Sequence, residues 1–551
     1  MECSSAPSVE IVAERPPSWI VCSSPALIGM SPASAIRGAA AWLAPAARPD
    51  QHDLMTPPAP GIPAPAIRPG ARIAILGGGL SGALFALHLL RDHPALPFVI
   101  DIVEPRERLG AGLAYDTDNP MLRINVSAAR MALFDEDRTH FDRWLRARGL
   151  PEDPDAERPD GTLFPRRCLF GIYVAGLLAD AAASSAGPAR LRHVRDRAVA
   201  VEGAAGDPPG SRGFAIELAG GGTVAADLVV LAMSHPPAAL PAPLRDLPEP
   251  VASRVLADPW DSRALDSIPY GDRVVVIGTG LTGCDVIAGL RGQGPKHGGH
   301  RGPIVGLSRH GLLPRPRTAL PVEAYGDFTT GPATDALALL RRVRAAIAGC
   351  EAAGRPWEDV VDALRKQAFV LWNALPKSEQ RRALRHLRTF WDVHRYQCAP
   401  QIDETMRAAQ ADGQLEIVAA SLRGVEAAPD GGVVLTLHPR HAPDVVRRRL
   451  QTDWIVNCTG PAHGGVLSSN PLLGAMAAAG MLVADPTGLG IAVDADAHLL
   501  RPDGSAWPSL FVVGPLARGT FGELMGLPQI SMQPRALAAH VASLAGKALA
   551  A

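Results

Sequence analysis

Three glycines near residue 77 have the spacing of a turn that binds a dinucleotide. Gly77, Gly79 and Gly82 follow the apolar run Ile73–Leu76 and precede a helical pattern, and Glu104 ends the next apolar run. Because glycine has no side chain, the backbone can approach a pyrophosphate at the positive end of the helix, while a carboxylate can accept hydrogen bonds from a ribose. The spacing predicts a dinucleotide site, with a tight structural turn as the alternative.

A second turn in the later half of the chain repeats this arrangement. Gly278, Gly280 and Gly283 form the same motif, but the next apolar run ends in Ser308 and Arg309, without a carboxylate. A carboxylate there would repel a 2′-phosphate, whereas Arg309 can neutralise one and Ser308 can donate to it. The second turn therefore favours NADP over NAD. In the alternative, Arg309 is an ordinary solvated charge at a strand end.

Each turn needs a strand that enters it and a helix that leaves it. The apolar runs 73–76 and 274–277 predict the two strands, and helical periodicity follows both turns. Later in each half, strand-like segments lead to an Asp before an apolar run, at 227–234 and 453–460, so the chain contains a degenerate internal repeat. These patterns predict an α/β fold with two Rossmann-like dinucleotide-binding domains, β-meanders and a helical insertion.

Two dinucleotide sites in one chain suggest that one cofactor is held permanently and that the other delivers hydride to it. A flavin and a nicotinamide are the natural pair for these roles. We predict six segments: an N-terminal extension that is expected to be disordered (1–69), the N-terminal portion of a discontinuous flavin domain (70–235), the N-terminal portion of the NADP domain (236–331), a helical insertion (332–412), NADP-domain strands (413–452) and the C-terminal portion of the flavin domain (453–551).

The overall composition excludes several classes of function. The 54 basic and 55 acidic side chains give a net charge of -1, which does not favour nucleic-acid binding. Apolar runs stay below the roughly 18 to 20 uncharged residues of a membrane-spanning helix. The seven cysteines have neither zinc-ligand nor Cys-x-x-Cys spacing, so we expect no metal and a reduced, cytoplasmic protein.

Further segments resemble one protein family. They are Gly110–Thr117, Leu122–Val126, Gly280–Gly283, Ser308–Gly311 and Phe511–Pro515. With the two glycine turns, they make the chain similar to the bacterial FAD/NAD(P)-binding flavoprotein oxidoreductases from about residue 71 to the C-terminus. That group includes an FAD-dependent urate hydroxylase. The resemblance implies FAD at the first turn and NADPH at the second.

The resemblance also implies roles for single residues. Glu104 is expected to hold the FAD ribose and Arg309 to face NADPH. Two segments are expected to lie along the flavin: the stretch Tyr115–Val126, which contains Asn125, and the region of Gly514. Pro515 stands where flavin reductases of the glutathione-reductase type usually have an aspartate. This difference points away from those reductases.

Four later side chains are candidates for a pocket near the flavin. His394 and Arg395 belong to an Arg-rich helical stretch, for which a solvated helix face is the alternative. Thr520 and Glu523 follow the last predicted strand, where the chain should approach the flavin ring; capping of the next helix is their alternative. Catalytic residues beyond the flavin are not indicated by any motif.

These features predict an FAD-dependent, NADPH-using monooxygenase or hydroxylase that acts on a small organic molecule and O₂. The Baeyer–Villiger fingerprint F-x-G-x-x-x-H-x-x-x-W is not found before the second glycine turn, which disfavours ketone oxygenation. One alternative is an NADPH-dependent flavin reductase or dehydrogenase without oxygen insertion. Another is a non-catalytic dinucleotide-sensing protein. The sequence indicates neither the substrate nor the oligomeric state.

Overall fold

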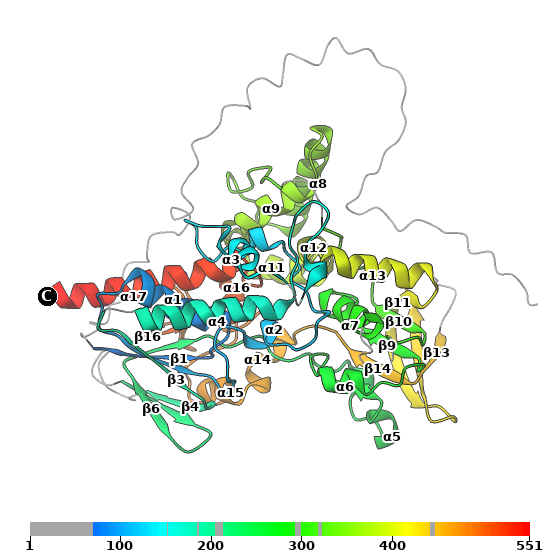
Figure 1. Cartoon of the computed structure of the whole chain (residues 1–551), viewed down its shortest axis with the longest axis horizontal. Coiled ribbons are helices and arrows are strands. Elements are labelled where there is room, and N and C mark those ends of the chain that lie inside the picture. The colour runs from blue at the N-terminus through cyan, green and yellow to red at the C-terminus, as the bar shows by residue number, and fades with distance from the viewer. Residues whose placement is uncertain are drawn as a thin grey trace, which may run out of the picture.

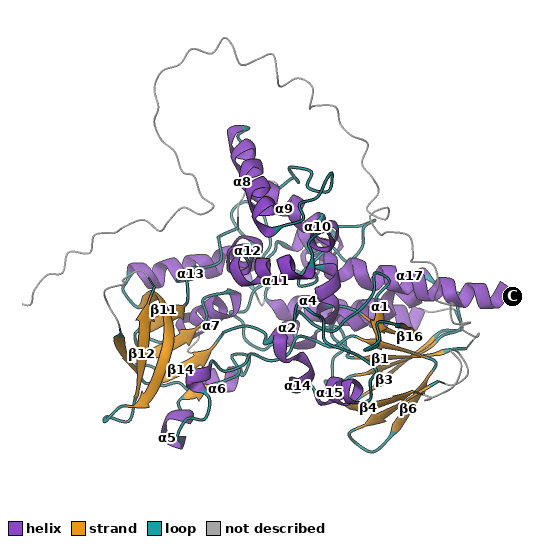
Figure 2. Ribbon diagram, turned by 180° about the vertical axis from the view of Figure 1, so that it is seen from behind, coloured by secondary structure: helices purple, strands orange, loops and turns teal. Residues whose placement is uncertain are grey.

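A computed structural model describes residues 70–550, apart from the segments 151–152, 185–186, 204–212, 293–298, 318–321 and 441–446. The predicted N-terminal extension, 1–69, lies outside the described residues. Two α/β units lie side by side, and a group of helices that includes α8 to α12 lies above the junction between them (Figure 1). The view from behind shows the same three units (Figure 2).

The first α/β unit is built on a six-stranded sheet. Its strands, in spatial order, are β15 (His498–Leu500), β16 (Ala506–Val512), β7 (Leu228–Leu231), β1 (Arg72–Leu76), β2 (Val99–Val103) and β3 (Arg190–Val194). All neighbours are parallel except β15, which runs antiparallel to β16. The glycine turn that follows β1 therefore lies in the middle of the sheet, at the carboxyl edge where ligands of such folds bind.

Alternate residues of β1 pack into two different cores. Ile73 and Ile75 lie in the core with three helices, α1 (Leu80–Asp92), α4 (Arg167–Ser184) and α17 (Gln529–Ala550). Ala74 and Leu76 lie in the core with a three-stranded meander, whose strands are β4 (Ala198–Gly203), β5 (Phe214–Leu218) and β6 (Thr223–Ala226). Both faces of the sheet are covered, which explains why β1 is an unbroken apolar run.

Helix α4 is, within the described residues of the chain, the one helix long and apolar enough to cross a membrane by length and composition. In the fold it packs against α1 and against the short helix α2 (Gly112–Tyr115). Its apolar residues Phe170, Tyr173 and Val174 belong to the core of the first unit. The composition of α4 is therefore accounted for by this packing.

The second α/β unit is built on a seven-stranded sheet. Its order is β13 (Arg448–Thr452), β12 (Val433–Pro439), β11 (Leu415–Ala427), β10 (Ile304–Ser308), β9 (Val274–Ile277), β14 (Trp454–Asn457) and β8 (Val255–Leu256). Strands β8, β14, β9, β10 and the start of β11 are parallel, and β11, β12 and β13 form an antiparallel meander. The predicted fold class is confirmed: both units are α/β, and each carries a β-meander.

The same hydrogen bond between an aspartate and a main-chain N–H occurs in both halves of the internal repeat. In the first unit the N–H of Arg72 donates to Asp227 Oδ2 at 2.7 Å, and in the second the N–H of Arg273 donates to Asp453 Oδ2 at 2.7 Å. Each Asp precedes a strand that pairs in parallel with the strand entering the glycine turn. The aspartate thus fixes the register of this pair in both halves.

This pairing corrects the boundary predicted at residue 453. The sequence pattern places β14 in the C-terminal portion of the FAD domain, but the strand pairs with β9 in the second unit. The end of the helical insertion also differs from the prediction. Helix α13 (Pro400–Ala411) packs against α7 (Leu281–Gly292) and leads into β11, so it is the crossover helix of the second sheet.

The helical unit proper consists of α8 (Ala336–Ala352), α9 (Glu358–Lys366), α10 (Ala368–Ala374), α11 (Lys377–His386) and α12 (Arg388–Arg395). A small core that includes Phe328, Ile347 and Leu371 holds it together. Helix α10 contacts α16 of the first unit. The remaining short helices are α3 (His140–Arg148), α5 (Glu249–Ala252), α6 (Ser262–Asp266), α14 (Val466–Ser469), α15 (Pro471–Ala478) and α16 (Arg518–Phe521).

A buried ion pair joins the two α/β units. Arg167 Nη2, at the start of α4, donates to Asp285 Oδ2 in α7 at 2.6 Å, and the two side chains are 12% and 7% exposed. Burial raises the pKa of Asp285, and the charge of Arg167 opposes this shift. The short, charge-assisted hydrogen bond between the units therefore offsets the free-energy cost of removing both charges from water.

We expect Asp285→Asn to lower the free energy of unfolding by about 2 kcal/mol, because Arg167 loses a charged partner inside the protein. Urea titration followed by tryptophan fluorescence measures the change. Glu416→Ala is the matched control, since its pair with Arg448 in the second unit is 54% and 42% exposed and contributes less than about 1 kcal/mol. Equal losses in both variants would contradict a special role for the buried pair.

Candidate functional site

The first glycine turn has the shape that a pyrophosphate needs. Gly77 has φ +111°, and a Cβ there would lie 2.7 Å from the carbonyl oxygen of Ala232. A Cβ on Gly82 would lie 2.1 Å from the carbonyl oxygen of Gly77. Both positions therefore require glycine, and together they bring the first turn of α1 against the end of β1.

Gly79 lies directly before α1 and is less crowded. The nearest atom to a Cβ built there is Gly112 Cα, at 3.5 Å. The first main-chain bond of the helix runs from Ala83 N–H to the carbonyl oxygen of Gly79, and the first turn contains no acidic residue. The N–H groups ahead of Ala83 and the positive helix end are thus available to an anion.

Glu104 lies beside this turn, as predicted. Its side chain is buried, and its carboxylate accepts hydrogen bonds from Gly78 N–H at 2.9 Å and from Arg106 N–H at 3.1 Å. Arg106 Nη1 also donates to Glu104 Oε1, at 3.3 Å. A carboxylate has about four acceptor positions, so these three bonds leave one position for a ribose hydroxyl. The residues at the first turn fit the adenosine half of FAD.

The second turn repeats the geometry. Gly278 has φ +107°, and a Cβ there would lie 2.1 Å from the carbonyl oxygen of Cys458; a Cβ on Gly283 would lie 2.0 Å from that of Gly278. A Cβ on Gly280 would meet no atom within 4 Å. The outer glycines shape the turn, whereas the space at Gly280 is open to a ligand. These residues fit a second dinucleotide.

Ser308 and Arg309 follow β10 beside this second turn. The Ser308 hydroxyl accepts from Gly311 N–H at 3.0 Å, and its oxygen lies 2.8 Å from Thr279 Oγ1. Arg309 is exposed and makes no hydrogen bond or ion pair with the residues that the structure describes. Ser308 is therefore integrated into the loop, while the guanidinium of Arg309 is available to a phosphate.

The segments predicted to lie along the flavin converge on the start of α1 and on the helical unit. Gly514 has φ +82°, and a Cβ there would lie 2.4 Å from Ser81 Oγ. Asn125 Nδ2 donates to the carbonyl oxygen of Gln397 at 3.2 Å. Thr520 Oγ1 donates to the carbonyl oxygen of Val493 at 2.8 Å, which is a contact within the protein.

A cavity of about 990 Å³ lies between the first α/β unit and the helical unit, and it brings His394, Arg395 and Glu523 together. His394 and Arg395 are 6% and 9% exposed, so a solvated helix face is excluded for them. Arg395 Nη2 lies 3.0 Å from Glu523 Oε1, and the Tyr396 hydroxyl donates to this carboxylate at 3.3 Å. Burial raises the pKa of Tyr396, with the charge of Glu523 adding to the effect.

His394 is a neutral residue in this cavity. Burial lowers its pKa, although a hydrogen bond to the main chain opposes the shift. Nδ1 lies 2.7 Å from the carbonyl oxygen of Phe390, and the buried Nε2 has no hydrogen-bond partner. The tautomer that donates from Nδ1 therefore leaves Nε2 as an acceptor. The imidazole ring also makes a T-shaped contact with the ring of Trp357.

Sequence reasoning missed Tyr396 and Arg317, which also belong to this region. Arg317 lines the cavity and donates from Nη2 to the carbonyl oxygen of Asn125 at 3.0 Å. It lies in an irregular loop next to prolines, where no periodicity marks a buried face. Tyr396 directly follows the two predicted residues His394 and Arg395.

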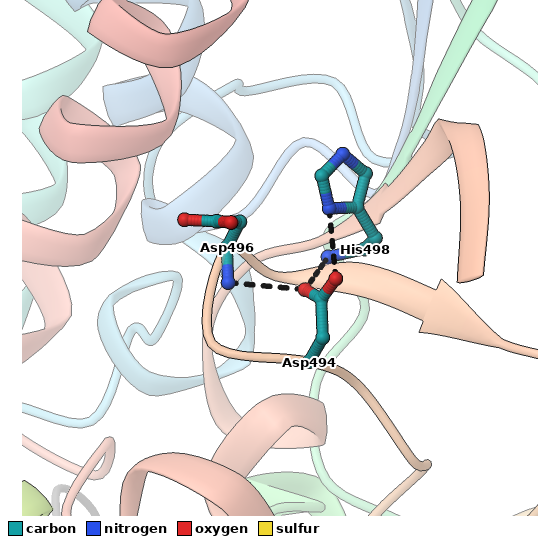
Figure 3. A group of neighbouring side chains, drawn as sticks. All are labelled: Asp494, Asp496 and His498. Atoms are coloured by element: carbon teal, nitrogen blue, oxygen red, sulfur yellow. Dashed lines mark hydrogen bonds and ion pairs between the residues drawn. The ribbon is translucent and has the colours of Figure 1, made fainter. Parts of the chain in front are cut away.

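Asp494, Asp496 and His498 lie close enough together to hold a metal ion. Their contacts with one another explain the arrangement (Figure 3). Asp494 Oδ1 accepts from the N–H groups of Asp496 and His498 at 3.0 and 2.8 Å, and Oδ2 lies 3.0 Å from His498 Nδ1. This is a turn closed by its own aspartate, and we assign no metal to it.

Comparisons with known proteins agree with this architecture. Residues 74–236 match the model of a family described as FAD-NAD(P)-binding. A search of curated proteins found no match.

Several solved structures share the fold. The ornithine N-hydroxylase of Kutzneria sp. 744, in a complex with reduced FAD, NADP⁺ and L-ornithine, is 17% identical, with 87% of this chain and 100% of that chain covered and a TM-score of 0.54. The ornithine hydroxylase of Pseudomonas aeruginosa is 13% identical (86% and 99% covered, TM-score 0.54). The L-lysine 6-monooxygenase of Pseudomonas syringae is 15% identical (87% and 100% covered, TM-score 0.53).

The predicted resemblance to FAD/NAD(P)-binding flavoproteins is thereby confirmed. The family match lies over the first glycine turn, and the shared fold extends over both α/β units and the helical unit. Residues 74–236 form an FAD-NAD(P)-binding domain, within a chain that has the fold of the two-dinucleotide flavoproteins.

Proposed function

We propose that this protein binds FAD at the first glycine turn and NADPH at the second, and that it oxygenates a small organic molecule. The observation that carries the proposal is the 990 Å³ cavity. Its wall contains Val126 and Glu523, which adjoin the two segments expected along the flavin, and residues of the helical unit form the opposite side. A small substrate in this cavity has access to the flavin end of the first site. Proteins with this fold include hydroxylases of ornithine and a monooxygenase of lysine.

In such an enzyme, bound FAD supplies the oxygen chemistry and NADPH supplies the hydride. The chain itself contributes binding, orientation and exclusion of water. The two glycine turns bind the pyrophosphates at helix N-termini, and Arg309 neutralises the 2′-phosphate. In the cavity, His394 Nε2 accepts a hydrogen bond from an N–H or O–H of the substrate.

Tyr396 holds its proton at a defined atom, and Glu523 is placed to accept one. The phenolic proton of Tyr396 stays on its oxygen because burial and the neighbouring carboxylate raise the pKa of the phenol and disfavour the phenolate. Glu523 remains an acceptor, oriented by Arg395 and by the Tyr396 hydroxyl. The carboxylate can thus take a proton from a substrate that loses one during oxidation.

The experiment is steady-state turnover of the FAD-loaded protein with NADPH and a panel of small amines and aromatic compounds. We expect substrate-dependent O₂ uptake and an oxygenated product. Fast anaerobic turnover with an artificial acceptor and no oxygenated product would instead identify a reductase. A bound flavin that NADPH does not bleach would identify a nucleotide-sensing protein.

Glu523→Gln tests the role of the cavity in this reaction. We expect unchanged flavin bleaching by NADPH, but at least about tenfold less product per NADPH consumed, because a positioned acid or base contributes about 10²-fold or more. Glu157→Gln is the control, since that side chain is 56% exposed and distant from the cavity lining. Full product yield in Glu523→Gln would remove Glu523 from the mechanism.

A further inference from the structure

One region of the cavity wall is strongly cationic. Arg130, Arg317, Arg365 and Arg395 all line the cavity, and they come from the turn Ala128–Arg130, the loop after β10, α9 and α12. These guanidinium groups are close enough to affect one another. Burial, together with the charges of Arg130, Arg395 and Arg365, lowers the pKa of Arg317 to about 9. Arg317 is therefore still charged at neutral pH.

The acidic residues nearby are already shared among these cations. Asp362 pairs with Arg365 at 2.5 Å, with Lys366 at 3.0 Å and with Arg130 at 3.6 Å. Glu523 pairs with Arg395. This part of the cavity wall therefore contains three carboxylates, those of Asp362, Glu523 and Glu358. It contains five cations, which are the four arginines and Lys366. The wall has a net positive charge.

Arg317 has no carboxylate partner. No acidic oxygen of the described residues lies within 4.0 Å of its guanidinium, and Glu358, the acidic group that acts on it, is beyond that distance. Burial raises the pKa of Glu358.

Three guanidinium nitrogens in this wall are buried and have no hydrogen-bond partner among the described residues. They are Arg317 Nε and the Nε and Nη2 of Arg395, of which Nη2 lies within ion-pair distance of Glu523. A buried cation and a buried N–H without a partner both destabilise a folded protein. An arrangement of this kind is typical of a site that is completed by a ligand.

We propose that this wall is a subsite for an oxyanion, the carboxylate or phosphate group of a small organic substrate, bound by Arg317 and Arg395. The planar guanidinium group matches both oxyanions in two-point hydrogen bonds. Calling the ligand a substrate rests on the proposed function, whereas binding of the anion does not. Arg317 also donates to Asn125, and Arg395 is paired with Glu523. A substrate whose anionic group binds to these two arginines therefore lies beside the residues that are expected to contact the flavin.

The test measures anion binding to the FAD-loaded protein without NADPH, at constant ionic strength set with chloride. The probes are benzoate and succinate, their amides, and inorganic phosphate, and the readouts are the thermal midpoint and the flavin absorbance spectrum. We expect the carboxylates to raise the midpoint and shift the spectrum, and the amides to do neither. A response to phosphate alone would support the subsite, with a phosphate ester as the ligand, if Arg317→Met abolishes it; a phosphate response that Arg317→Met retains belongs to the second glycine turn and would overturn the proposal. Equal responses to acid and amide would overturn the proposal.

Variants at Arg317 separate ligand binding from structure. Arg317→Met removes a partly buried charge that has no carboxylate partner, so we expect a higher midpoint without probe and no response to benzoate or succinate. Arg317→Lys keeps the charge without the two-point geometry, and we expect at least tenfold weaker binding. This variant also keeps the test decisive if Arg317→Met does not fold.

The control is Arg138→Gln, at the solvent end of the cavity, where the side chain is 67% exposed. We expect it to bind the probes as the unaltered protein does. The assignment would be overturned if Arg317→Met had a lower thermal midpoint and still responded to benzoate and succinate. Arg317 would then stabilise the fold without binding the anion. Because no turnover occurs in this assay, a protein that binds anions but oxygenates nothing would retain the subsite and lose only the proposed function.

Discussion

Replacing Gly82 with alanine is expected to yield protein that purifies without flavin. The new Cβ would lie 2.1 Å from the carbonyl oxygen of Gly77 and 3.1 Å from Ala232 Cβ, so α1 has to move away from the end of β1. The N–H groups of its first turn then lose their position on the pyrophosphate. Overpacking of this kind costs about 1 to 3 kcal/mol, which corresponds to about a 5- to 150-fold loss of FAD affinity.

The matched control for this substitution is Gly176→Ala. Gly176 also lies within a helix of the first unit, α4, but a Cβ there meets no atom within 4 Å. Alanine is the better helix former, so this variant should keep its flavin and gain up to about 1 kcal/mol of stability. Absorbance at the flavin maximum, relative to protein absorbance, gives the flavin content of both. Full flavin content in Gly82→Ala would contradict the assignment of FAD to this turn.

Arg309→Ala is expected to raise the KM for NADPH by about 10- to 100-fold and to leave the KM for NADH almost unchanged. A charge-assisted hydrogen bond to the 2′-phosphate contributes about 1.5 to 3 kcal/mol, and NADH has no such phosphate. The initial rate of flavin bleaching at varied NADPH and NADH measures the two constants. The side chain is exposed and has no partner among the described residues, so its removal should not disturb the fold.

Arg301→Ala is the control for Arg309. Arg301 is also exposed, but it precedes β10, whereas Arg309 follows the carboxyl end of that strand, next to the glycine turn. A general electrostatic effect on NADPH would appear in both variants, and recognition of the 2′-phosphate only in Arg309→Ala. Equal increases for NADPH and NADH in Arg309→Ala would refute the phosphate assignment.

The anion subsite and the proposed reaction both depend on the helical unit. This unit interrupts the second α/β unit between β10 and α13 and lies above the junction of the two α/β units (Figure 1). Its helix α12 supplies His394 and Arg395, while Glu523 comes from the first unit. A shift of the helical unit relative to the first unit would therefore separate Arg395 from Glu523.

The two glycine turns, the strands and helices beside them, and the fold class can all be predicted from the amino-acid sequence. These features depend on neighbours within a few residues: Gly77 and Gly278 adopt positive φ in the turn, and the apolar runs before them are strands covered on both faces. It also indicated the repeat, because Asp227 and Asp453 precede equivalent strands.

The assignment of β14 and α13 to the second α/β unit could not be predicted from the sequence. The same is true of the side chains that meet in the cavity, because both depend on long-range packing. An apolar strand such as 454–457 fits either sheet, and its partner is chosen by long-range pairing with β9. Arg317, Arg395 and Glu523 are far apart in the chain, and a charged side chain in a local pattern looks the same whether it is solvated or buried. Their burial follows from the packing of the helical unit on the first α/β unit, and no local spacing of residues specifies that contact.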